Sequence, residues 1–177
     1  WINRNITPLS FLSPLKEVFQ EQNGIPTDDP LKTLLDDRKA TSASISIGQH
    51  PLCFGWINAV CKADPDSIFN AVGLLEELFD RNGYEFRVTM TAVNPRTFIL
   101  ISNITYPREK AAIEKALAFK HQCYEMLNKH GFLPYRSGSG MFEDLPPYSL
   151  AKKNLLNQLK SIFDPNKLLA PGKYNID

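Results

Sequence analysis

The chain has 177 residues, of which 43% are hydrophobic and 22% charged, proportions typical of a folded globular protein. Its 20 Lys and Arg residues nearly balance its 19 Asp and Glu residues, so the net charge is +1 and no broad positive field is available to bind nucleic acid or an anionic membrane surface. The longest apolar stretch, residues 52–61, is about half of the roughly 20 residues that a helix needs to cross a bilayer. We therefore expect one domain over residues 1–177, with neither nucleic acid nor a membrane as partner.

The three cysteines, Cys53, Cys61 and Cys123, have no metal-binding spacing, and their number is odd. This pattern favours free thiols in a reducing compartment, so we expect a cytoplasmic protein, with the periplasm as the alternative. No signal peptide or lipidation motif is visible. Because the first residue is Trp1 and not Met, we expect the chain to begin inside a longer one or after processing.

Two short helices are expected in the N-terminal part. The first begins with Ser13 as its cap and ends at Gly24. The second covers residues 31–37, with Thr27 or Asp28 as its cap. Irregular segments are expected elsewhere in this part, over residues 1–12 and 38–44.

A strand followed by a helix comes next. The strand, His50–Cys61, is apolar on both faces, which predicts a central position in a sheet. The helix begins at Asp64-Pro65 and ends at Gly83. Its buried stripe is expected to contain Ile68, Val72, Leu75 and Phe79.

Two further strands form an expected antiparallel hairpin. Tyr84–Val93 alternates between apolar and polar residues, and Thr97–Thr105 is rich in β-branched residues. A long helix should follow from Pro107 to His130, before Gly131. Its inward residues are expected to be Ala112, Ala116, Phe119, Cys123 and Met126.

The rest of the chain contains a short extended piece over residues 132–136, a flexible linker over 137–140, and a last helix over 147–163. The inward residues of this helix are expected to be Ala151, Leu155, Leu159 and Ile162. Antiparallel strands with helices packed on one face define an α+β fold, close to a ferredoxin-like arrangement.

Common catalytic motifs are absent, including Gly-x-Ser-x-Gly, the P-loop, the dinucleotide Gly-x-Gly-x-x-Gly and His-Glu-x-x-His. One local cluster stands out, Pro134-Tyr135-Arg136. Arg136 offers a permanent forked cation, and Tyr135 offers a phenol that can hydrogen-bond another phenol. A surface tyrosine beside a salt-bridged arginine is the simpler reading of this pair.

Three segments, in this order along the chain, resemble signatures of FAD-linked oxidases. They are Gly24-Ile25-Pro26-Thr27-Asp28-Asp29-Pro30-Leu31, Gly131-Phe132-Leu133-Pro134-Tyr135-Arg136, and the tail Asp164-Pro165-Asn166-Lys167-Leu168-Leu169-Ala170-Pro171-Gly172-Lys173. The resemblance is to the vanillyl-alcohol oxidase and 4-cresol dehydrogenase (hydroxylating) branch. It implies that the chain is the C-terminal cap, or substrate, domain of such an enzyme, and that the FAD-binding domain is absent from it.

The resemblance also implies roles for three residues. Tyr135 matches the family tyrosine that hydrogen-bonds the phenol oxygen of the substrate, and Arg136 matches the arginine near N1 of the flavin. Lys173 matches a lysine that either approaches the flavin edge or closes the C-terminal loop, and we favour the loop. Some family members tether FAD through a His or Tyr, but Phe98, or Thr97 with a one-residue slip, stands at that position here. This difference implies non-covalent FAD, or a chain that has lost the cofactor role.

Two interpretations remain open from the sequence. In the first, the chain serves an FAD-dependent oxidoreductase that oxidises a 4-alkylphenol or related aromatic alcohol by hydride transfer to flavin. Its expected partners are an FAD-binding domain or subunit, a phenolic substrate, a cytochrome as possible electron acceptor, and further copies of itself. In the second, the chain is a catalytically inactive cap that serves as an interaction or oligomerisation module.

Overall fold

The computed structural model describes residues 15–35, 48–138 and 141–176. Several sequence predictions lie outside these residues: the helix start at Ser13, the irregular segments at 1–12 and 38–44, and the end of the linker at 139–140. By its internal contacts the chain divides into two compact units, residues 1–54 and 55–177.

The first unit contains helices α2 (Leu15–Gln22) and α3 (Asp29–Leu34), which confirms both predicted short helices. Gly24 follows α2 with a φ of 75°, a left-handed conformation that glycine adopts without strain. Helix α3 begins and ends earlier than predicted. Asp28 stands at its N-cap position, but the Asp28 side chain makes no capping hydrogen bond.

A three-stranded antiparallel sheet forms the centre of the fold, with β3 (Thr97–Pro107) between β1 (Leu52–Lys62) and β2 (Val88–Asn94). The predicted central position of β1 is therefore wrong, because β3 is the middle strand. The outer side of β1 is met by a single antiparallel bridge between Val60 and Leu133. This bridge stands where a ferredoxin-like fold has its fourth strand.

The β2–β3 hairpin is confirmed, with Val88 opposite Ser102 and Met90 opposite Leu100. Strand β2 begins at Val88 and not at Tyr84, although Tyr84 still packs against the core. Met90 lies on the apolar side of the alternating pattern but is 55% exposed, and all residues of β2 after Val88 are exposed.

Helix α4 (Pro65–Asn82) has the predicted ends. The Oδ1 atom of Asp64 accepts a hydrogen bond from the backbone N–H of Ser67 at 2.8 Å, and Gly83 ends the helix with a φ of 71°. Its fully buried residues are Ala71, Leu75 and Phe79, with Ile68 and Val72 packed beside them.

Helix α5 (Lys110–Lys129) begins later than predicted, because Pro107 is the last residue of β3 and Glu109 is the N-cap of the helix. The buried residues of α5 are Ala116, Phe119, Cys123, Tyr124 and Leu127. Of the predicted inward residues, Ala112 and Met126 are only half-buried.

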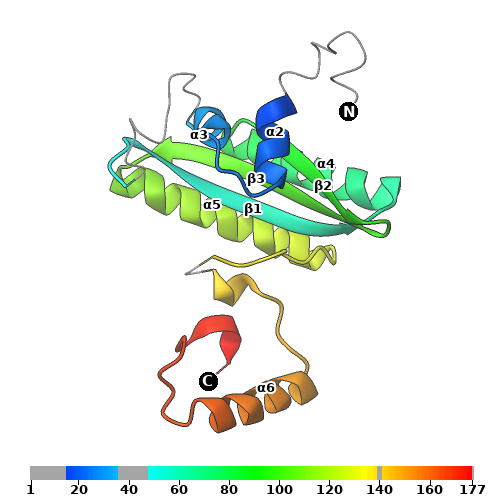
Figure 1. Cartoon of the computed structure of the whole chain (residues 1–177), viewed down its shortest axis with the longest axis vertical. Coiled ribbons are helices and arrows are strands. Elements are labelled where there is room, and N and C mark those ends of the chain that lie inside the picture. The colour runs from blue at the N-terminus through cyan, green and yellow to red at the C-terminus, as the bar shows by residue number, and fades with distance from the viewer. Residues whose placement is uncertain (1–14, 36–47, 139–140, 177) are drawn as a thin grey trace. The chain divides into compact units, whose positions relative to one another are not determined.

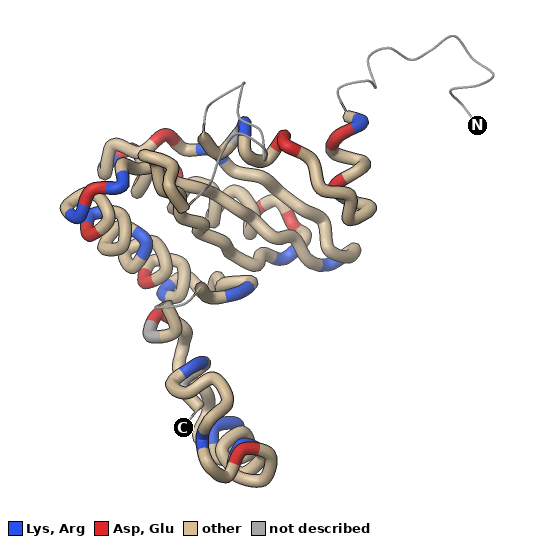
Figure 2. The backbone as a smooth tube through the Cα atoms, turned by 60° about the vertical axis from the view of Figure 1, so that its left-hand side comes forward, with Lys and Arg blue, Asp and Glu red and all other residues tan. Residues whose placement is uncertain are grey.

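Helices α4 and α5 run along the sheet (Figure 1), and their apolar faces share one core with β1 and β3. Phe79 of α4 stands at its centre, in edge-to-face contact with Phe86 and with Phe119 of α5 at ring-centroid distances of 5.1 and 5.0 Å. Lysine and glutamate residues are interspersed along α5 (Figure 2). The predicted α+β class, with helices on one face of an antiparallel sheet, is confirmed.

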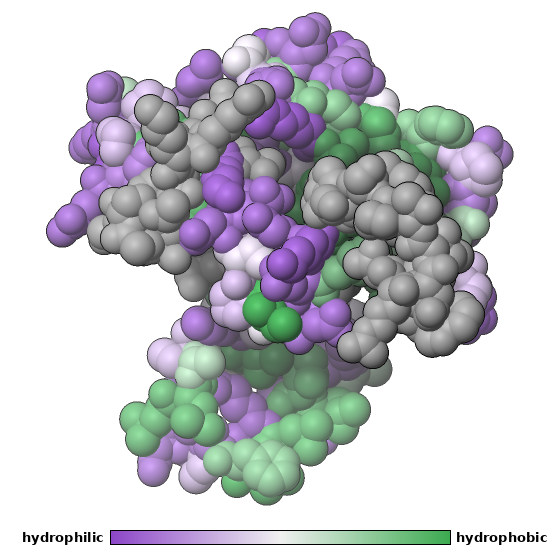
Figure 3. Space-filling model, turned by 45° about the horizontal axis from the view of Figure 1, so that its top comes forward, coloured by the Kyte–Doolittle hydropathy of each residue, from purple (hydrophilic) through white to green (hydrophobic). Residues whose placement is uncertain are grey.

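Helix α6 (Leu150–Phe163) is capped by Ser149, whose Oγ accepts a hydrogen bond from the backbone N–H of Lys152. The predicted inward stripe of this helix is wrong, because α6 has no buried residue and Leu155 and Ile162 are 56% and 70% exposed. No element among the described residues covers this stripe. Apolar residues accordingly gather on the surface of the C-terminal segment (Figure 3).

Candidate functional site

Tyr135 and Arg136 lie two and three residues beyond the Val60–Leu133 bridge, on the segment that follows α5. Both side chains are exposed, Tyr135 to 52%. The guanidinium carbon of Arg136 lies 5.3 Å from the centre of the Tyr135 ring, so the two side chains lie side by side. No ion pair between described residues involves Arg136.

The backbone of this pair is held by Asn58, a polar residue buried in β1 with 7% exposure. Its Oδ1 accepts hydrogen bonds from the backbone N–H groups of Tyr135 at 2.6 Å and Arg136 at 3.2 Å. Its Nδ2 donates to the carbonyl oxygen of Arg136 at 3.1 Å. This role was not predicted from the sequence, although a lone carboxamide within an apolar strand is a signal for it.

The second hydrogen of Asn58 Nδ2 is donated to the hydroxyl oxygen of Tyr124, at 3.2 Å. Tyr124 is a buried residue of α5. Burial raises the pKa of its phenol to about 12, outweighing the opposite effect of the Asn58 hydrogen bond, so the phenol stays neutral at physiological pH. Helix α5, strand β1 and the Tyr135–Arg136 segment thus meet at one buried amide.

The segment after Arg136 is also fixed to α5. Ser137 Oγ donates to the carbonyl oxygen of Met141 at 2.7 Å, and Met141 is buried in the core. In the short 3₁₀ helix η2 (Phe142–Asp144), Asp144 Oδ1 lies 2.6 Å from Nδ1 of His121 on α5. Burial lowers the pKa of the neighbouring Lys120, although the Asp144 charge acts in the opposite direction.

The tail motif that begins with Asp164 forms a loop around this carboxylate, which is 7% exposed. Asp164 Oδ1 accepts from the backbone N–H of Leu168 at 2.8 Å, and Oδ2 accepts from Leu169 at 2.9 Å. Lys160 Nζ donates to Oδ2 at 3.0 Å and to the carbonyl oxygen of Leu169 at 2.8 Å. Loop closure therefore explains the aspartate of this motif, because a carboxylate can accept hydrogen bonds from Leu168, Leu169 and Lys160 together.

Lys173 begins the 3₁₀ helix η3 (Lys173–Asn175), and its side chain is exposed. Its neighbour Tyr174 stacks edge-on against Phe142 of η2, at 4.8 Å between ring centroids. Among the described residues, no hydrogen bond or ion pair joins Lys173 to Tyr135 or Arg136. The structure therefore places Tyr135 and Arg136 side by side, whereas Lys173 lies in η3.

The expected tether position lies at the start of β3, where Thr97 and Phe98 are both half-buried. Neither side chain has the imidazole or phenol that would bond to a flavin ring.

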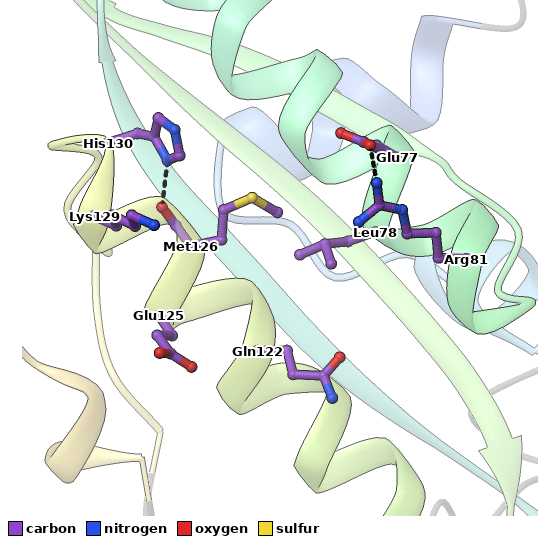
Figure 4. A pocket seen from close by; sticks show the side chains of 8 residues that line it. All are labelled: Glu77, Leu78, Arg81, Gln122, Glu125, Met126, Lys129 and His130. Atoms are coloured by element: carbon purple, nitrogen blue, oxygen red, sulfur yellow. Dashed lines mark hydrogen bonds and ion pairs between the residues drawn. The ribbon is translucent and has the colours of Figure 1, made fainter.

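A shallow hollow of about 350 Å³ lies between α4 and α5, on their outer side (Figure 4). Its walls carry both charges, with Glu77 and Arg81 paired to each other on α4. On α5, His130 Nδ1 lies 2.9 Å from the carbonyl oxygen of Met126. None of the sequence-predicted site residues lines this hollow, so it is separate from the Tyr135–Arg136 pair.

Within residues 15–35, 48–138 and 141–176, no cluster of three or more His, Cys, Asp or Glu side chains is arranged to hold a metal ion. No described helix combines the length and apolar character needed to cross a membrane.

No protein-family model matches the chain. Among curated proteins it is similar to 1'-carboxy-chondrochloren decarboxylase of Chondromyces crocatus, with 22% identity over 154 residues, which cover 86% of this chain and 28% of that protein. The chain therefore spans little more than a quarter of the length of this relative.

Two solved structures share the fold. One is p-cresol methylhydroxylase with substrate bound, with a TM-score of 0.63, 22% identity, and coverage of 70% of this chain and 24% of that one. The other is 4-ethylphenol oxidase of Gulosibacter chungangensis in an isoeugenol complex, with a TM-score of 0.63 and 17% identity. The match covers 72% of this chain and 25% of that one. The resemblance drawn from the three motifs is thus confirmed at the level of the fold.

Proposed function

We propose that this chain is the cap domain of an FAD-dependent oxidoreductase that oxidises a 4-alkylphenol or a related aromatic alcohol. The observation that carries the proposal is the exposed Tyr135–Arg136 pair, whose backbone is fixed by a buried amide and whose cation has no carboxylate partner among the described residues. The shared fold with two enzymes named for phenolic substrates supports it.

In this proposal Tyr135 donates a hydrogen bond to the phenol oxygen of the substrate. A donor aimed at that oxygen stabilises the phenolate, and an anionic ring oxygen makes it easier for hydride to leave the benzylic carbon. Bound FAD supplies the hydride acceptor. Arg136 places a permanent positive charge where negative charge develops on reduction, and such a charge is most effective in a site from which water is excluded. Lys173 keeps the loop-closing role that the sequence favoured.

An FAD-binding domain or subunit is the partner that this proposal requires. The uncovered apolar stripe of α6, with Leu168 and Leu169 of the tail loop, is a surface of the kind that a partner domain covers. The same surface supports the second candidate function, an inactive cap that serves as an interaction or oligomerisation module. A cytochrome as electron acceptor and a cytoplasmic location also remain proposals.

The experiment that separates the two functions joins this chain to its FAD-binding partner and adds 4-ethylphenol without oxygen. Loss of the visible absorbance of oxidised flavin is the expected result. A protein that binds FAD and assembles, but keeps its flavin oxidised with every 4-alkylphenol and 4-hydroxybenzyl alcohol tested, would favour the inactive module.

A further inference from the structure

We propose that Asn58 is the positioning residue of this site, because its one side chain sets the backbone conformation from which both Tyr135 and Arg136 project. The proposal rests on the proposed function for the roles of the two side chains. The contacts themselves are independent of that function.

The Asn58 carboxamide binds three successive peptide groups. The Tyr135 N–H belongs to the peptide that joins residues 134 and 135, and the Arg136 N–H belongs to the next peptide. The Arg136 carbonyl belongs to the third. The φ and ψ angles of Tyr135 relate the first two planes, and those of Arg136 relate the last two. Fixing three planes therefore fixes all four backbone angles of the pair.

The geometry also determines which way the Asn58 amide points. A carboxamide has two N–H donors and two acceptor lone pairs, and here all four are used. The two backbone N–H groups require the oxygen on their side, while the Arg136 carbonyl requires the nitrogen. The reversed amide would leave buried polar groups without partners, which is costly in a low-dielectric interior.

The preceding residues strengthen the anchor. The Val60 N–H donates to the carbonyl oxygen of Leu133 at 2.8 Å, so a fourth successive peptide is fixed to β1. Pro134 has a restricted φ between these two anchors. The exposed Tyr135 and Arg136 side chains therefore project from a backbone that is anchored to β1 through four successive peptide groups.

Direction matters for the proposed chemistry because Tyr135 and Arg136 must reach different atoms, the substrate oxygen and the flavin edge. A misplacement of about 1 Å at a reacting centre can cost on the order of a hundredfold in rate. Asn58 itself, buried in β1, has no exposed face from which to touch a substrate.

The test compares two variants that disturb the same buried network. Asn58→Leu keeps the side-chain size and removes every hydrogen bond to the pair. Tyr124→Phe is the matched control, because it removes one partner of the Asn58 amide and leaves the bonds to Tyr135 and Arg136 intact. Should Asn58→Leu fail to fold, Asn58→Asp keeps both acceptor bonds and puts a carboxylate against the Arg136 carbonyl.

Amide hydrogen exchange is measured first, on the protein as produced. In Asn58→Leu the amides of Tyr135 and Arg136 should exchange at least about tenfold faster, while the Val60 amide keeps its protection. In Asn58→Asp the two amides should stay protected. Unchanged exchange at Tyr135 and Arg136 in Asn58→Leu would overturn the proposal, whatever the enzyme does.

Turnover of 4-ethylphenol by the FAD-loaded protein is measured second. In both Asn58→Leu and Asn58→Asp, kcat/KM should fall at least about tenfold. The pH profile of kcat/KM in these variants should shift toward the solution pKa of the phenol. In the control Tyr124→Phe, kcat/KM should change by less than about threefold. Faster exchange with wild-type turnover and pH profile would overturn the positioning role. Wild-type protein that does not oxidise the phenol would refute the proposed function instead, and the exchange rates would then decide alone whether Asn58 holds the pair.

Discussion

The ammonium group of Lys160 lies 3.0 Å from the Oδ2 atom of Asp164, one helical turn further along the chain, and both side chains are largely buried. This contact joins the end of α6 to the tail loop, because the same carboxylate holds the Leu168 and Leu169 amides. Burial alone would raise the Asp164 pKa, but these hydrogen bonds and the Lys160 charge together hold it below its ordinary value.

Acid should therefore loosen this loop. A carboxylate whose pKa is lower in the folded state stabilises the fold fully above the ordinary aspartate pKa of about 3.9, and this stabilisation is lost as the pH falls through the lowered value. Limited proteolysis of the tail as a function of pH should show protection at neutral pH that disappears below about pH 4. At neutral pH the tail of Asp164→Asn should be cleaved as readily as the wild-type tail is cleaved in acid. The control Glu76→Gln, at an exposed position, should keep the wild-type protection at neutral pH. Equal cleavage of Asp164→Asn and wild type at every pH would contradict this account of the motif.

The Asp64 cap should contribute measurably to stability. Asp64→Ala removes the acceptor of the Ser67 N–H and should lower the free energy of unfolding by about 1 kcal/mol. Urea denaturation measures this change. Asp64→Ser retains a capping oxygen and should lose less, so an equal loss in both variants would mean that the cap is not the cause.

Two of the three thiols should be inert in the folded protein. Burial raises the pKa of Cys61 to about 11, with the Asp64 charge adding to the effect, and burial raises that of Cys123 to about 12. At pH 8 about one Cys61 in a thousand or fewer is then a thiolate, and the thiolate is the reactive form. A thiol reagent with mass-spectrometric readout should label the half-buried Cys53 first and the other two only after denaturation. Labelling of Cys123 as fast as Cys53 in native protein would contradict this burial.

The apolar stripe of α6 should matter for assembly and not for folding. Leu155→Ser with Ile162→Ser should leave the thermal midpoint of the chain nearly unchanged, because both side chains are already exposed. The same pair should prevent stable association with the FAD-binding partner, as seen by co-purification. Phe69→Ser, at a 73% exposed position on α4, serves as the control and should still associate. Normal co-purification of the α6 variant would remove this stripe from the interface.

Sequence patterns predicted the features whose causes are local. Asp64, Pro65 and Gly83 delimit α4 because capping and backbone preference act within a few residues. The predicted central position of β1 was wrong because the sequence of an apolar strand does not distinguish a full neighbouring strand from a bridge on its outer side. The predicted burial of the α6 stripe was wrong because amphipathic spacing identifies the apolar face of a helix but not what covers that face.

In the candidate site, too, only local features could be predicted from the sequence. Tyr135 and Arg136 could be found as a local cluster, and the motif that contains them could be matched to a family. The role of Asn58 could not, since its partners lie 77 and 78 residues further along and only the folded chain brings them together.

The most direct test of the central claim is the rate of flavin reduction by 4-ethylphenol in the FAD-loaded protein, wild type against Tyr135→Phe. Removing one hydrogen-bond donor from a developing anion costs on the order of a hundredfold in rate, so we expect a loss of that size while FAD remains bound. Tyr148→Phe, a half-buried tyrosine outside the pair, is the control and should reduce its flavin at the wild-type rate. Equal reduction rates in wild type and Tyr135→Phe would contradict the proposed role of this residue in phenol oxidation.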